Sequence, residues 1–187
     1  MEFRLYYRGG LRANGSAGEK QRIRRSFHPQ LKRLWEQPRP PGFFKTWFVN
    51  NQAEGVINRS RRVVGNFVCM PLVSESVNLA AELDILFLRP QQPGSIINSA
   101  GDIDNRLKTL LDALRIPKPA ELTATDIPSS EENPLFCLLE DDILVTRIAV
   151  TTDRLLDADE RSTEVVLVIH VLLKEGGYIK DFWPGLQ

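Results

Sequence analysis

The sequence predicts an α/β fold of the α+β type, in which a mixed, largely antiparallel sheet packs with helices. Apolar residues alternate over 79–88, as in a half-buried strand, and recur at helical spacing over 102–114. Residues 164–173 form a nearly continuous Val, Leu and Ile run, which is typical of a buried strand. With 187 residues, of which 42% are hydrophobic, the chain is expected to form one domain spanning 1–187.

The N-terminal segment is predicted to form a strand, a loop and a helix. Residues 3–8 alternate between apolar and basic, and the glycines that follow mark turns. Over 19–36 the spacing of Ile23, Phe27 and Leu31 is helical. Pro29 is expected to kink or split this helix, because proline removes a backbone hydrogen bond.

Strands are expected at 63–73 and 79–88, where they would form an antiparallel pair. The helix over 102–114 follows. Its apolar stripe runs through Ile103, Leu107, Leu110, Leu111 and Leu114. The Pro-rich stretch at about 115–134 is interpreted as an inserted loop, in part disordered. Strands at 143–151 and 164–173 would close the fold, joined by a hairpin loop.

Composition excludes several classes of protein. No apolar run reaches the roughly 18 residues of a membrane span, and the N-terminus lacks the apolar stretch of a signal peptide. We therefore expect a cytoplasmic protein without a membrane partner. Cys69 and Cys137 show no disulfide or zinc-site spacing and lie in apolar runs, so both are expected to be buried apolar side chains.

Charge is unevenly distributed although the formal net charge is zero. Residues 1–62 contain 14 Lys and Arg against 4 Asp and Glu, whereas the remainder contains 10 against 20. This division suits a polyanion-binding surface beside a metal-binding carboxylate cluster, and equally a fold whose halves neutralise one another. On the first interpretation, the basic side chains that would follow a DNA backbone are Arg22, Arg24, Arg25, Lys32 and Arg33.

Acidic residues gather at two places that bear on chemistry. Asp104, Lys108 and Asp112 are spaced to share one helical face, with Asp102 at the start of the helix. Glu140, Asp141 and Asp142 precede a strand. Carboxylates in such numbers suit a hard cation such as Mg²⁺, or alternatively Mn²⁺, which can activate water for attack on a phosphodiester. Taken singly, each part also has a structural explanation: a helix cap, an exposed ion-pair network and a solvated turn.

Together, these segments resemble a known family. The strings Asp102-Ile103-Asp104-Asn105-Arg106-Leu107-Lys108-Thr109-Leu110-Leu111-Asp112-Ala113-Leu114 and Glu140-Asp141-Asp142-Ile143-Leu144-Val145 resemble the core signature of the RusA family of Holliday junction resolvases. The resemblance implies a dimeric, Mg²⁺-dependent endonuclease of branched DNA. By position, Asp102, Asp104 and Asp142 match its essential carboxylates, with Asp141 directly before Asp142, and Lys108 matches a lysine implicated in catalysis.

The leading hypothesis is therefore a metal-dependent endodeoxyribonuclease that needs no small-molecule cofactor and resolves Holliday junctions or related branched DNA as a homodimer. Asp102, Asp104 and Asp142, with Asp141, would hold the metal, and Lys108 would assist. One alternative is a catalytically inactive RusA-like module whose 115–134 insertion covers the site and which binds DNA or protein. Another is an acidic-patch protein that binds protein alone.

Overall fold

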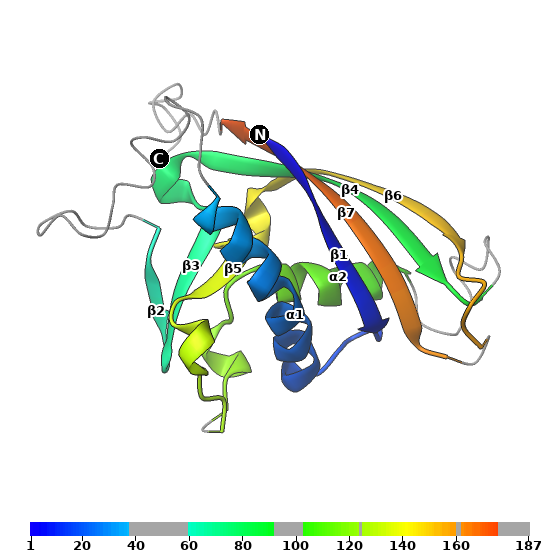
Figure 1. Ribbon diagram of the computed structural model, residues 1–187, viewed down its shortest axis with the longest axis horizontal. Coiled ribbons are helices and arrows are strands. Elements are labelled where there is room, and N and C mark those ends of the chain that lie inside the picture. Colours follow the sequence, from blue (N-terminus) through cyan, green and yellow to red (C-terminus); the bar gives the residue numbers. More distant parts are fainter. Residues whose placement is uncertain (38–59, 92–102, 124, 160–161, 176–187) are drawn as a thin grey trace, which may run out of the picture.

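The computed structural model describes residues 1–37, 60–91, 103–123, 125–159 and 162–175. It confirms the predicted α+β class: within these ranges, two α-helices pack with seven strands (Figure 1). The strands form two mixed sheets, where the sequence suggested one. None of the helices in the described ranges is long and apolar enough to cross a membrane.

The larger sheet contains four strands in the order β1, β7, β4, β6. They are β1 (Glu2–Gly10), β7 (Glu164–Glu175), β4 (Leu79–Arg89) and β6 (Val145–Arg154). β7 is antiparallel to both β1 and β4, whereas β4 and β6 run parallel. The predicted hairpin between the last two strands is therefore wrong, because β4 lies between them.

The smaller sheet contains β2 (Arg62–Val64), β3 (Phe67–Val73) and β5 (Leu135–Leu139) in that order. The single strand expected at 63–73 is broken at Gly65, whose positive φ of 56° turns β2 back on β3. The expected pairing of this segment with β4 is also wrong, because β3 instead pairs in parallel with β5. A 3-10 turn, η1 (Glu75–Val77), separates β3 from β4.

Two helices cover one face of the larger sheet: α1 (Ala17–Glu36) and α2 (Ile103–Leu114) (Figure 1). α1 begins at Ser16, whose hydroxyl accepts a hydrogen bond from the Glu19 amide. It continues through Pro29, so the expected split does not occur. Burial of Ile23, Phe27 and Leu31 on one face stabilises the helix and offsets the free energy lost with the hydrogen bond that proline cannot make.

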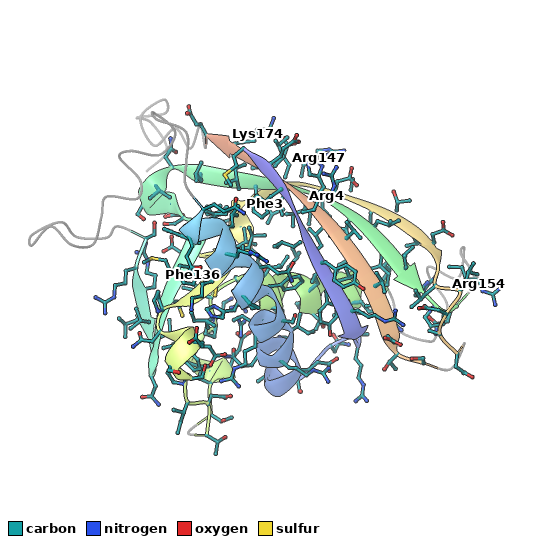
Figure 2. The ribbon with its side chains drawn as sticks, viewed as in Figure 1. Phe3, Arg4, Phe136, Arg147, Arg154 and Lys174 are labelled. Atoms are coloured by element: carbon teal, nitrogen blue, oxygen red, sulfur yellow. The ribbon has the colours of Figure 1, made fainter. Side chains whose placement is uncertain are left out.

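The main core lies between the helices and the larger sheet. Alternate residues of β4, including Leu83, Ile85 and Phe87, are fully buried together with Leu110 of α2. At the second sheet, Phe136 of β5 stacks on His28 of α1 with ring centroids 5.7 Å apart (Figure 2). The apolar residues that alternate along β4 therefore lie on the face of the sheet that the helices cover, as expected for a half-buried strand.

The inserted stretch at 115–134 is folded in the parts that the structure describes. It contains two 3-10 turns, η2 (Pro119–Glu121) and η3 (Ser130–Glu132). Ion pairs link it to α1, from Arg25 to Glu132 at 2.7 Å and from Lys32 to Glu131 at 2.5 Å. These contacts replace the partly disordered loop that was expected. Both cysteines are buried beside this stretch, as predicted.

Candidate functional site

α2 presents part of the predicted acidic cluster to solvent. Asp104 and Lys108 are both exposed, whereas Leu110 and Ala113 lie on the opposite, buried face. Asp104 Oδ1 accepts a hydrogen bond from the Asn105 amide at 2.9 Å, which orients this carboxylate at the start of the helix. Asp102, the other carboxylate predicted here, lies outside the described residues.

The second acidic segment divides into two parts. Glu140 Oε1 accepts from Arg62 Nε at 2.5 Å, so a cation of the second sheet already neutralises it. Asp141 caps the 3-10 turn η4 (Asp142–Leu144) by accepting from the Ile143 amide at 3.1 Å. Because η4 packs against both α2 and β4, Asp141 and Asp142 lie beside the helix that carries Asp104.

Asp141 and Asp142 interact directly, and the interaction moves their pKa values in opposite directions. Burial raises the pKa of Asp142, and its hydrogen bond to Asp141 raises it further. Burial also acts to raise the pKa of Asp141, but hydrogen bonds from Ile143 and Asp142 outweigh it and hold the pKa below its ordinary value. Asp142 is therefore the carboxyl that keeps a proton more readily, and Asp141 the one that ionises first.

The described structure brings together only part of the predicted metal centre. No three His, Cys, Asp or Glu side chains among the described residues form a group that could hold a metal ion. Asp104, Asp141 and Asp142 are among these described residues, whereas Asp102 is not. What the fold does assemble is an acidic pair at η4 that packs beside α2, with Arg115 and Lys118 as its charged neighbours.

The helical spacing predicts Asp112 on the same exposed face as Asp104 and Lys108. The structure instead places its side chain in the interior, where it has a structural role. It is buried and forms ion pairs with Lys20 at 2.6 Å and with Arg115 at 2.7 Å. Burial alone would raise the pKa of Asp112, yet hydrogen bonds from the two cations hold it below its ordinary value. Glu121 joins the same network, 2.7 Å from Arg115. This group joins α1 to the C-terminal end of α2.

The prediction that Arg24 binds DNA is wrong. Its side chain is part of this buried network and cannot contact a DNA backbone. Its side chain is 2% exposed, and its Nε and Nη2 donate to the backbone carbonyls of Arg115 at 2.8 Å and Asp112 at 2.6 Å. Those carbonyls lie at the C-terminal end of α2, where the helix leaves them without internal donors. Arg24 lies three residues before Phe27 and seven before Leu31, so helical spacing was a signal in the sequence that it belongs to the buried face.

The other four predicted DNA-binding side chains differ in availability. Arg33 is exposed, and Arg22 is 65% exposed, with its Nη2 3.9 Å from Glu19. Arg25 and Lys32 are engaged by the carboxylates of η3. Of the predicted set, Arg22 and Arg33 are thus the ones most open to a polyanion.

A cavity of about 470 Å³ lies where the end of β1 meets the start of α1. Its lining includes the two arginines Arg12 and Arg22, together with Glu19 and Thr163. Glu19 also accepts from the Arg12 amide at 3.0 Å, which ties the loop after β1 to the helix. Arg12 was not among the predicted site residues; its position beside a Gly-rich turn was the only signal in the sequence.

Two further arginines of the core were not predicted. Arg89, the last residue of β4, is 4% exposed, and Arg106, in the first turn of α2, is 7% exposed. Burial lowers the pKa of Arg106, and the positive charge of Arg89 lowers it further, so the two guanidinium groups repel one another. In the sequence both stood in apparently ordinary positions, at a strand end and on an amphipathic helix.

Comparison with protein-family models, with curated proteins and with solved structures finds no match.

Proposed function

We propose that this protein is a divalent-metal-dependent endonuclease that acts on branched DNA. One observation carries the proposal: α2 exposes Asp104 and Lys108, and the turn that bears Asp141 and Asp142 packs against the same helix. Carboxylate oxygens beside an ammonium are the side chains that phosphodiester hydrolysis with a hard cation needs. The order of these residues is also that of the RusA signature.

The carboxylate oxygens of Asp141 and Asp142 would suit a hard divalent cation such as Mg²⁺, which would also relieve the repulsion between them. Asp104 would complete the ligands from α2, together with Asp102, which lies two residues before it in the sequence. A bound cation supplies Lewis-acid stabilisation of the phosphoryl group and lowers the pKa of a water molecule. Mn²⁺, with the same preference for oxygen, is the expected substitute.

The chain's own side chains would divide the remaining work. Lys108, exposed one turn beyond Asp104, would offset negative charge on the phosphoryl oxygens as the P–O bond breaks. Arg22 and Arg33 on α1 would hold the DNA backbone through its phosphates. Symmetric cutting of two strands would require two such sites related by a two-fold axis, so a homodimer belongs to the proposal.

The decisive experiment is a nicking assay on a synthetic four-way junction with and without Mg²⁺. We expect Mg²⁺-dependent nicking by the wild type and a loss of about 100-fold or more in Asp104→Asn. Asp84→Asn is a matched control, because Asp84 is an exposed aspartate on β4, and it should cut at the wild-type rate. Wild-type protein that binds the junction without nicking it would instead favour the inactive-module alternative.

Metal binding can be measured apart from cleavage. Mg²⁺ should raise the melting temperature of the wild type, because a ligand that binds the folded state stabilises it by mass action. Asp142→Asn removes one proposed ligand and should reduce that rise, whereas Asp84→Asn should keep it. An equal Mg²⁺ effect in all three proteins would remove Asp142 from the metal site.

A further inference from the structure

β6 lies at one edge of the larger sheet, with β4 on one side and none of the described strands on the other (Figure 1). An edge strand presents a row of backbone N–H and C=O groups with which a further strand can pair. β6 is 10 residues long, and each of its residues is exposed or half-buried. They include the apolar side chain of Ile148, which is 42% exposed. A long, exposed edge of this kind is open to strand addition.

The opposite edge of the same sheet is protected by a side chain. Tyr6 of β1 donates its amide to Gln30 Oε1 at 2.9 Å, and its carbonyl accepts from Gln30 Nε2 at 2.7 Å. Gln30 of α1 thereby occupies backbone groups that another strand would need. Among the described residues, no helix side chain bonds the backbone of β6 between Val145 and Asp153 in this way. The two edges therefore differ, and β6 is the one left available.

The charges of β6 make this edge complementary to itself. Arg147 lies three residues before Val150, and Asp153 lies three residues after it. Both charged side chains are exposed, and their register with Glu82 and Leu88 of β4 places both on the sheet face that the helices do not cover. If two copies of β6 run antiparallel about Val150, each Arg147 lies directly opposite the partner's Asp153. Opposite charges at facing positions stabilise such a pair of strands.

We propose that a second copy of this chain pairs its β6 with β6 here, antiparallel and about a two-fold axis at Val150, so that two four-stranded sheets become one. The symmetry uses the pair of Arg147 and Asp153 twice. On the side that faces the helices, Ile148 would lie opposite the partner's Thr152, which covers part of the exposed isoleucine. A shift in register separates Arg147 from the partner's Asp153, so the charges also fix the register. The interface goes beyond the proposed nuclease, because it needs neither DNA nor a metal ion.

Sedimentation equilibrium of the whole chain, without DNA or Mg²⁺, tests this interface. We expect a reversible dimer in the wild type. Arg147→Glu should weaken its association by about tenfold or more, because two symmetry-related attractions become repulsions between acids. Asp153→Arg should weaken it in the same way by bringing arginines together. Arg4→Glu is the matched control, because Arg4 is an exposed arginine of β1, at the other edge of the sheet (Figure 2), and should leave the dimer unchanged.

The double variant Arg147→Glu/Asp153→Arg restores opposite charges across the axis, and its dissociation constant should return to within about threefold of the wild-type value. Misfolding of a single variant could not produce that recovery. A wild type that stays monomeric at about 100 μM would overturn the proposal. So would a dimer that Arg147→Glu leaves intact, or a double variant as weak as the single ones. A failed nicking assay leaves these measurements standing, and a monomeric wild type leaves the Mg²⁺-dependent rise in melting temperature to be judged separately.

Discussion

Replacing Arg24 by methionine should destabilise the protein strongly while leaving its exposed surface unchanged. The guanidinium donates to two backbone carbonyls at the C-terminal end of α2 and lies 3.6 Å from Glu121. Each hydrogen bond from a charged donor contributes about 1.5–3 kcal/mol, and the acceptors left behind would be buried. Burial itself lowers the pKa of Arg24, which shows that dehydration of the charge offsets part of this gain.

The net effect expected for Arg24→Met is a fall of about 2–4 kcal/mol in the free energy of unfolding. For a domain of this size, that corresponds to a melting temperature lower by roughly 10 °C. Urea denaturation followed by circular dichroism measures it directly. Arg22→Met is the matched control on the same helix, and at 65% side-chain exposure it should change stability by no more than about 0.5 kcal/mol. Equal stabilities of the two variants would refute the structural role assigned to Arg24.

Two further outcomes are expected. Asp112→Asn should lower the free energy of unfolding by about 2–4 kcal/mol at neutral pH, because it removes a partner of both Lys20 and Arg115. The folded state holds the pKa of Asp112 down, so its stabilisation is complete above the unfolded pKa of about 3.9 and is lost as pH falls through the lower folded value. The wild type and the variant should therefore converge in urea denaturation below about pH 4, and a constant difference from pH 7 to pH 3 would contradict the assignment. Arg22→Met should weaken DNA binding and, if Arg22 contacts one phosphate, reduce the slope of log affinity against log salt by about 0.9 in a filter-binding titration; an unchanged slope would remove Arg22 from the interface.

The sequence was most informative where one periodicity dominated. The helix at 102–114 and the strand at 79–88 were located within a residue or two, because each has one apolar face against the core. Strand pairing was less predictable. β4 lies between β6 and β7 and runs parallel to β6, an arrangement that depends on contacts far apart in the sequence.

In the candidate site, too, local spacing was predictable from the sequence and contacts between distant residues were not. The exposed positions of Asp104 and Lys108 followed from helical spacing alone. Asp112, four residues beyond Lys108, has the same spacing but is buried, because Lys20 of α1 and Arg115 lie against it. Arg24 and Arg89 share the spacing of the buried residues around them, but the acceptors that a buried arginine meets depend on neighbours from other elements.

The pairing of β1 with β7 has a consequence for synthesis of the chain. Tyr6 of β1 pairs with Val168 of β7, so β1 cannot pair until a segment some 160 residues further along the chain has been synthesised. At translation rates of 5–20 residues per second, that interval is on the order of ten seconds or more. During it, Leu5 and Tyr7, both buried in the finished protein, have no sheet to cover them. The nascent N-terminal segment is therefore where a chaperone that binds apolar segments would be expected to act.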